Sequence, residues 1–364
     1  MQRPRIRDWG IKIGCYATGK HNAITDVAGV RVGQTTIIQG EGKLIQGRGP
    51  IRTGVTAILP HSDDLFHHRV AAGGFTLNGA GEVTGLSQAS EWGAIETPIM
   101  LTNTLSVGQV HDAVLDYLLE YYPDAGIISD PIVPIVAECD DSHLNDIQGR
   151  HVTREHVFAA LRSATAGPVA EGCVGAGTGM IAFDFKAGIG TASRVLPRHC
   201  GGFTIGVLVL ANCGPRHCFQ VAGCPVGREI TDLIPDPHPD GSIIVVIATD
   251  APLISLQLQR IAKRAALGIG RLGGFASHVS GEFCIAFSTR TIFPRKSSNL
   301  TVELELLRDQ YLDPLFEATV EATEEAIINS LMQATDMCGR DGHLVHALPL
   351  DRLYRMLKKQ GLAD

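Results

Sequence analysis

Residues 242–249, with the sequence Ser-Ile-Ile-Val-Val-Ile-Ala-Thr, form the most β-prone run in this chain. A run of this kind predicts a buried strand. Residues 203–212 form a second buried strand of similar character. Both runs are therefore expected to lie in the core of the protein.

Shorter apolar runs and helical periodicities complete this picture. Further strands are expected at residues 28–36, 54–60, 99–103, 131–138 and 283–288. Helices are expected at residues 106–122, 153–163, 252–266 and 351–360, and over 302–337 in two pieces broken near Pro314. Ser106 is predicted to cap the first of these helices, and Pro252 fits the first position of the third. The mixture of strands and long helices predicts an α+β or layered α/β protein.

Composition excludes several classes of protein. The 364 residues are 45% hydrophobic with a net charge of −7, and no cluster of lysines and arginines predicts a nucleic-acid surface. No run of 18 apolar residues predicts a membrane span, and the first 14 residues do not resemble a signal peptide. Nine cysteines, several of them inside apolar runs, indicate reduced thiols and a cytoplasmic location.

The loop that precedes the β-prone run has unusual chemistry. Residues 235–241 read Pro-Asp-Pro-His-Pro-Asp-Gly, and three prolines in five residues predict an irregular, exposed loop. Gly241 offers little steric hindrance to attack on its carbonyl, and Ser242 begins a buried strand that would hold its hydroxyl in place. A hydroxyl fixed beside the preceding carbonyl can attack it, and hydrolysis of the resulting ester would free an α-amine with an ordinary pKa of about 7.7–8.0.

Six blocks of sequence resemble those of the L-aminopeptidase D-amidase/esterase family, which includes the β-aminopeptidases. They occur in the family's order and extend over most of the chain. The matching blocks are residues 22–33, 77–82, 102–104, 175–180, 188–194 and 240–252.

The resemblance implies a single catalytic domain whose precursor is cut between Gly241 and Ser242, giving an α chain of residues 1–241 and a β chain of residues 242–364. It implies a four-layer αββα sandwich, like that of N-terminal-nucleophile hydrolases but with distinct connectivity. It also implies a self-processing serine aminopeptidase or amidase that releases L-, D- or β-amino acids from short peptides, amides or esters. A homotetramer is expected, with no cofactor and no metal.

The resemblance also gives expectations for the site. Ser242 would be the nucleophile, and Asn212 would donate a hydrogen bond to the oxyanion. Ser280 and Glu282 resemble the family's serine and glutamate pair. Ser280 could contact the hydroxyl or the amine of Ser242, while Glu282 could stabilise the ammonium form. Since residues i and i+2 of a strand point the same way, both could reach one pocket.

One stretch departs from the family pattern. A tyrosine expected near residues 138–145 is absent, and the sequence there is Glu-Cys-Asp-Asp-Ser-His-Leu-Asn. His143 or a water molecule could take the tyrosine's place in the oxyanion hole. Glu138 is the candidate anchor for the substrate's free amine, because an aminopeptidase needs a carboxylate to select ammonium termini.

Two alternatives stay open at this point. The same apparatus could transfer acyl groups between amines, as in ornithine acetyltransferases, although their nucleophile is threonine and residue 242 is serine. The missing tyrosine also leaves room for an uncleaved, non-enzymatic binding protein.

Overall fold

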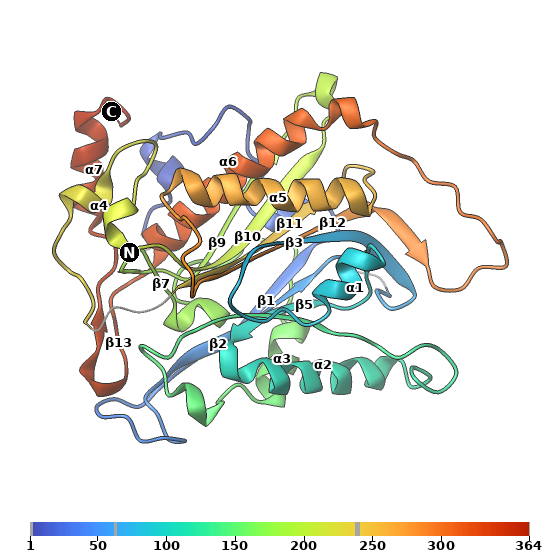
Figure 1. The fold of residues 1–364 in the computed structure, drawn as a ribbon, viewed down its shortest axis with the longest axis horizontal. Helices are drawn as coiled ribbons and strands as arrows, with labels where there is room; N and C mark the ends of the chain where they lie inside the picture. Colours follow the sequence, from blue (N-terminus) through green and yellow to red (C-terminus); the bar gives the residue numbers. More distant parts are fainter. Residues whose placement is uncertain (1–2, 62–63, 237–240, 364) are drawn as a thin grey trace.

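The computed structural model describes residues 3–61, 64–236 and 241–363. Two sheets lie face to face and helices cover the outer face of each, so the chain forms four layers in the order α, β, β, α (Figure 1). This confirms the expected fold class. Part of the 235–241 loop lies outside the described residues. Within the described residues no helix is long and apolar enough to cross a membrane.

The smaller sheet has four strands in the order β1-β2-β5-β6, with α2 and α3 packed on its outer face. Its strands β5 and β6 are parallel, and their final residues, Asn103 and Cys139, are paired at the same end of the sheet. The bounds are β1 Arg31–Gln39, β2 Ile51–Leu59, β5 Ile99–Asn103, β6 Ile135–Cys139, α2 Val107–Tyr121 and α3 Arg154–Arg162.

The larger sheet has six strands in the order β4-β3-β12-β11-β10-β9, with α5 and α6 on its outer face. Strands β11 and β12 are parallel neighbours in its centre. The bounds are β3 His68–Gly79, β4 Ala94–Ile95, β9 Ile189–Val195, β10 Thr204–Asn212, β11 Ser242–Thr249, β12 Gly281–Pro294, α5 Ser255–Arg271 and α6 Asp313–Gln333. Shorter elements are α1 Leu86–Glu91, α4 Val226–Glu229, β7 Ile181–Ala182, β8 Phe185–Lys186, β13 Met337–Cys338, β14 Leu344–Val345 and α7 Leu350–Lys359.

Strand β11 is buried on both faces, as its composition predicts. Ile243, Val245 and Ile247 pack in the core beneath α5 and α6. Ile244 and Val246, on the other face, pack in the core between the two sheets. This alternation fixes the direction of every side chain on the strand, including that of its first residue, Ser242.

Three local predictions were wrong. Residues 301–308 contain no helix, and α6 begins at Asp313 with Pro314 in its first turn, where a proline is tolerated. The cap before α2 comes from Asn103, whose side-chain oxygen accepts a hydrogen bond from the amide of Ser106. Helix α5 begins three residues after Pro252, at Ser255.

Candidate active site

Ser242 is the first residue of β11, and its side chain is 6% exposed. It has the same parity as Ile244 and Val246, so its hydroxyl points between the two sheets. Across the ladders it is paired with Asn212 of β10 and with Gly281 of β12. The hydroxyl therefore lies where the start of β11 meets the ends of β5 and β6.

A cavity of ≈ 480 Å³ opens in front of this hydroxyl. Its polar lining includes two carboxylic acids and three hydroxyl groups, and no lysine, arginine or histidine is among the described residues that line it. The lining residues are Ala80, Gly81, Thr104, Leu105, Glu138, Asp140, Ser142, Ile147, Gly241, Ser242 and Val279. A cavity with this charge favours ligands that carry a cation.

Glu138 lies in this cavity and is 4% exposed. One carboxylate oxygen accepts a hydrogen bond from the amide of Glu82 at 2.9 Å, and the other accepts one from the hydroxyl of Thr104. Burial raises the pKa of Glu138, while these two donors lower it. The structure thus brings Glu138 together with Ser242, as the ammonium-anchor hypothesis requires.

Asn212 is also buried beside Ser242. Its side-chain oxygen accepts a hydrogen bond from the amide of Ile181 at 2.7 Å, and its Nδ2 donates to the carbonyl of Asp140 at 3.0 Å. These two bonds fix the orientation of the amide group. Since Nδ2 carries two hydrogens and one is used, a second donor is left for an oxyanion.

Ser280 and Glu282 lie on the other face of the same sheet. The hydroxyl of Ser280 donates a hydrogen bond to Glu282, and both residues line a small pocket of ≈ 10 Å³ that also contacts Cys213 and residues of the α5–β12 connection. Burial raises the pKa of Glu282, and its Oε2 has no hydrogen-bond partner among the described residues. Both side chains do reach one pocket, as the i, i+2 spacing predicts.

The register determines which part of Ser242 this pair can reach. Gly281, between Ser280 and Glu282, is paired with Ser242, so the pair and the Ser242 hydroxyl lie on opposite faces. The group that lies between them in the plane of the sheet is the main-chain nitrogen of Ser242. The geometry therefore favours contact with the amine over contact with the hydroxyl, and the orphaned oxygen of Glu282 suits a cation there.

Gly241 is confined by the neighbouring strand. A Cβ atom at this position would lie 2.8 Å from the carbonyl oxygen of Asn212 and 3.1 Å from the Cα of Cys213. A side chain here would therefore force residue 241 or the end of β10 to move.

His143 lies elsewhere. Its ring stacks on that of His343 at 4.6 Å, and it is not among the residues that line the cavity. Burial and the neighbouring His343 and Arg340 lower the pKa of His143 to about 4. The structure does not support His143 as an oxyanion donor. Asp140 and Ser142 are the residues of this stretch that line the cavity, and Ser142 donates to Asp140 through both its amide and its hydroxyl.

Two contacts of the site were not predicted from the sequence. The hydroxyl of Thr104 donates a hydrogen bond to Glu138, and the buried thiol of Cys139 lies 3.6 Å from the carbonyl oxygen of Leu210, in the strand next to β11. Both residues follow from the pairing of β5 with β6, which places residues 103 and 139 side by side at the end of the sheet. Where these two residues lie relative to β11 depends on how the two sheets stack.

Comparisons with known proteins identify relatives of this chain. The model of peptidase family S58 matches residues 22–345. A β-peptidyl aminopeptidase, BapA, of Sphingosinicella xenopeptidilytica is 44% identical over 98% of this chain and 91% of its own length. The structure of a Burkholderia β-aminopeptidase superposes with a TM-score of 0.91 at 44% identity, covering 98% of this chain and 99% of that one.

A further solved structure has the same fold. It is an L-aminopeptidase D-Ala-esterase/amidase of Ochrobactrum anthropi, described as a variant of the N-terminal-nucleophile hydrolase fold. It superposes over the whole of both chains, with a TM-score of 0.92 at 43% identity.

Proposed function

Because the chain belongs to peptidase family S58, we propose that it cuts itself between Gly241 and Ser242 and then acts through an acyl-enzyme on Ser242. It is an aminopeptidase, and its substrates are short peptides, amides or esters with a free N-terminus. The observation that carries the mechanism is the position of Ser242, at the start of a buried strand and at the wall of an acidic cavity.

Self-cleavage begins with the hydroxyl of Ser242. Its oxygen attacks the carbonyl carbon of Gly241, the C–N bond breaks as the nitrogen takes up the proton that the hydroxyl releases, and the acyl group passes from the nitrogen to the oxygen of Ser242. Water then hydrolyses this ester, leaving a carboxylate on Gly241 and a free α-amine on Ser242. That amine, generated beside Ser280 and the buried Glu282, becomes the base of the mature enzyme.

The substrate reaction uses the same atoms. Glu138 binds the ammonium group of the substrate, which brings the carbonyl after the first residue to the hydroxyl of Ser242. The α-amine takes the hydroxyl proton, and Asn212 donates a hydrogen bond to the oxyanion. The amine then protonates the leaving group, and water releases the N-terminal residue.

The lining of the cavity limits the substrate class. Glu138 and Asp140 carry negative charge, and the described lining offers no cation to balance it. Substrates with a free ammonium group are favoured, and residues with an acidic side chain at the N-terminus are disfavoured. The ≈ 480 Å³ volume leaves room for the additional methylene of a β-amino acid.

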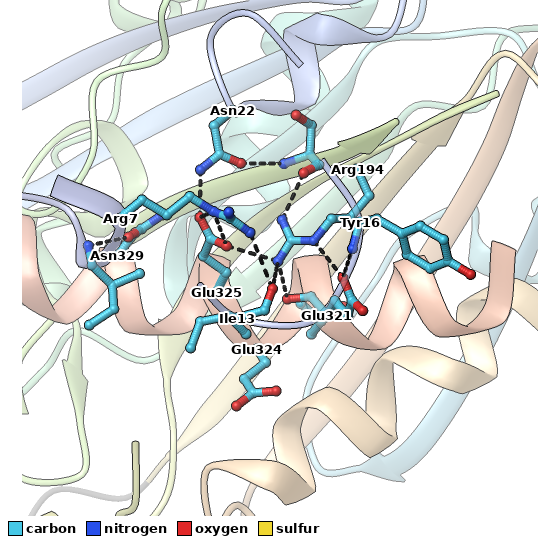
Figure 2. Close-up of polar contacts among 12 residues, drawn as sticks. Arg7, Ile13, Tyr16, Asn22, Arg194, Glu321, Glu324, Glu325 and Asn329 are labelled. Atoms are coloured by element: carbon cyan, nitrogen blue, oxygen red, sulfur yellow. Dashed lines mark hydrogen bonds and ion pairs between the residues drawn. The ribbon is translucent and has the colours of Figure 1, made fainter. Parts of the chain in front are cut away.

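Mature enzyme would consist of two chains held together by a buried ionic network, shown in Figure 2. Arg194, which is fully buried, pairs with Glu321 and Glu325 of α6, with N···O distances of 2.8 Å. Arg7 also pairs with Glu325 at 2.8 Å. Both arginines belong to the proposed α chain and both glutamates to the β chain, so cleavage would leave the two chains joined.

A homotetramer is the proposed assembly, and one surface supports contact with a second copy. After β12 the chain leaves the body of the molecule before it returns at α6 (Figure 1). Alternate residues of this extended segment are large, apolar and exposed: Leu300, Val302, Leu304 and Leu306. Apolar side chains alternating along an extended segment match the pattern of a strand with one covered face.

A reducing compartment such as the cytoplasm is the proposed location. All nine cysteines are free in the structure, and four of them are buried. Reduced, buried thiols are typical of proteins that are kept in a reducing environment.

Hydrolysis of N-terminal β-alanyl and L-alanyl amides by the purified protein tests this proposal. Release of the free amino acid is expected for the wild type, with no release from the same amides acetylated at their N-terminus. The Ser242→Ala variant should release none. Turnover by Ser242→Ala at the wild-type rate would contradict the assignment of the nucleophile.

A further inference from the structure

A side-chain amide at the end of β3 reaches across to the loop that precedes β12. The Nδ2 of Asn78 donates hydrogen bonds to the carbonyl oxygens of Ser277 at 2.9 Å and of His278 at 3.2 Å, and a third to that of Ser280. Since Nδ2 carries two hydrogens, at least one of them is shared between two carbonyls. One side chain thus holds three of the four residues in the loop 277–280.

A β-bulge directs Asn78 to this loop. In the pairing of β3 with β12, Asn78 lies opposite Glu282 and Thr76 lies opposite Phe283, so β3 contains one extra residue between the two pairs. Residues directly opposite each other on paired strands point to the same face of the sheet. Asn78 therefore shares the helix side of the sheet with Glu282. Without the bulge, Leu77 would take that place.

The loop that Asn78 holds contributes to both parts of the candidate site. Residues 274–280 belong to no helix or strand, so their positions depend on contacts of this kind. Ser277 and Ser280 line the small pocket that contains Glu282, and Val279 lines the ≈ 480 Å³ cavity. The residue whose carbonyl binds Asn78, Ser280, is also the residue whose hydroxyl donates to Glu282.

We propose that Asn78 is a positioning residue for proton transfer. Its amide fixes the loop so that the hydroxyl of Ser280 stays hydrogen-bonded to Glu282, beside the amine of Ser242. The inference rests on the proposed function of Ser242 and of this pair. Asn78 is not among the described residues that line the cavity, so its side chain acts on proton transfer and not on substrate binding.

The main chain that follows Asn78 serves the binding side of the site. Ala80 and Gly81 line the cavity, and the amide of Glu82 donates a hydrogen bond to Glu138 at 2.9 Å. A Cβ atom at Gly81 would lie 2.7 Å from Oε1 of Glu138. The proposed anchor of the substrate is thus held by main-chain groups, and the side chain of Asn78 can be changed without removing them.

Two substitutions of Asn78 remove its donors in different ways. Asn78→Ala deletes the amide, and Asn78→Asp keeps nearly the same volume but places a carboxylate against three carbonyl oxygens. With both we expect kcat for an alanyl amide to fall about tenfold, the effect of about one hydrogen bond. KM should stay within about threefold, because Glu138 keeps its partner Glu82. The control Gln46→Ala, which removes an exposed amide elsewhere, should match the wild type.

A double-mutant cycle tests whether Asn78 acts through Ser280. The kcat values of the wild type, Asn78→Ala, Ser280→Ala and the double variant are compared, after intact mass and thermal unfolding have shown that each protein is folded and cleaved. If Asn78 acts by placing Ser280, its loss should lower kcat by less than about twofold once the hydroxyl of Ser280 is absent. A residue that only stabilises the fold would lower kcat by the same factor in both backgrounds.

Each outcome bears on the proposal. Wild-type kcat in both Asn78→Ala and Asn78→Asp, equal factors in the two backgrounds of the cycle, or a change confined to KM would each overturn it. A folded Asn78→Ala protein that does not cut itself would also overturn it, because the role would then lie in self-cleavage. Wild-type kcat in Ser280→Ala alone, or a wild-type protein that neither cuts itself nor hydrolyses amides, would instead refute the proposed function, and the inference with it.

Discussion

At the scale of single residues, the proposed mechanism assigns substrate binding and proton transfer to opposite faces of one sheet. Glu138 and the hydroxyl of Ser242 lie on the cavity side, whereas Ser280 and Glu282 lie on the helix side of the same sheet. The main-chain nitrogen of Ser242 lies in the plane of the sheet, between these two faces. In the proposed mechanism one residue can thus serve as nucleophile and base, because it begins a strand in the middle of a sheet.

Glu138→Gln should impair substrate binding. The glutamine oxygen can still accept a hydrogen bond from the amide of Glu82, and its amide nitrogen can donate one to the hydroxyl of Thr104, while the negative charge is lost. A charge-assisted hydrogen bond contributes about 1.5–3 kcal/mol, so kcat/KM should fall roughly 10- to 100-fold, mainly through KM. Steady-state kinetics on an alanyl amide measure this. The exposed Glu41→Gln should behave as the wild type, and an unchanged KM in Glu138→Gln would contradict the anchor role.

The fall of kcat/KM at acidic pH should reflect the protonation of Glu138. Burial raises the pKa of Glu138, so its carboxylate is lost at a higher pH than that of an exposed glutamate. As pH falls through this raised pKa, kcat/KM should fall with it. In Glu138→Gln the acid limb should move or disappear, and an identical limb in both proteins would assign it to another group.

Asp141 should make the protein less stable as pH rises. It is fully buried beside Asn145, and burial raises its pKa to about 7. Because the raised pKa favours the protonated form in the folded state, the penalty begins above the unfolded pKa of about 4 and is complete above about 7. The slope is at most about 1.4 kcal/mol per pH unit. Asp141→Asn should lose this dependence, as followed by chemical unfolding at several pH values. An equal slope in both proteins would contradict the assignment.

At the scale of elements, α6 connects the proposed fragments. Glu321 and Glu325 of this helix pair with arginines from the first 241 residues, in a network that also includes Asn22 and the carbonyl of Ile13 (Figure 2). Several of these charges are shielded from water, so their pairing matters more than that of surface charges.

Arg194→Ala should destabilise the protein strongly. It leaves Glu321 without its buried partner and Glu325 with Arg7 alone, and an uncompensated buried charge costs about 3–5 kcal/mol. Thermal unfolding of the variant measures the loss. The exposed Arg355→Ala, which breaks only a surface pair with Asp351, should change stability by less than about 0.5 kcal/mol. Equal unfolding temperatures for the two variants would contradict the role given to the network.

Some elements could be predicted from the sequence and others could not. Strands β5 and β11 have the predicted bounds, because continuous apolar runs end at clear turn signals. Strands β3 and β9 were missed, because glycines interrupt their patterns. In β3, Gly73 allows α5 to pack closely against the strand, since a Cβ there would lie 2.5 Å from the amide nitrogen of Gln259. Such close approaches are tertiary requirements that a local pattern does not contain.

The candidate site, too, could be predicted from the sequence only in part. Ser242, Ser280 and Glu282 could be singled out from the resemblance and from strand periodicity. Their division between two faces depends on the pairing of Ser242 with Gly281, and a shift of one residue would reverse it. The position of Glu138 beside Ser242 depends on how the two sheets stack, and the local sequence of either strand does not contain that information.

At the scale of the whole molecule, the exposed apolar segment after β12 should mediate assembly. The double variant Leu300→Asp, Leu304→Asp places charges on its apolar face and should reduce the molar mass measured by light scattering in solution. The control Leu267→Asp, at an exposed position on α5, should leave the molar mass unchanged. A double variant with the wild-type molar mass would place the subunit contact elsewhere.

The central claim is that one bond, between Gly241 and Ser242, is cut by the chain itself. The most direct measurement is the intact mass of purified wild-type protein and of Ser242→Ala. We expect two fragments from the wild type, the smaller beginning at Ser242, whose masses sum to that of the chain plus one water, and a single full-length chain from the variant. A full-length mass in both proteins would contradict the claim, because without the cut there is no free amine to serve as the base.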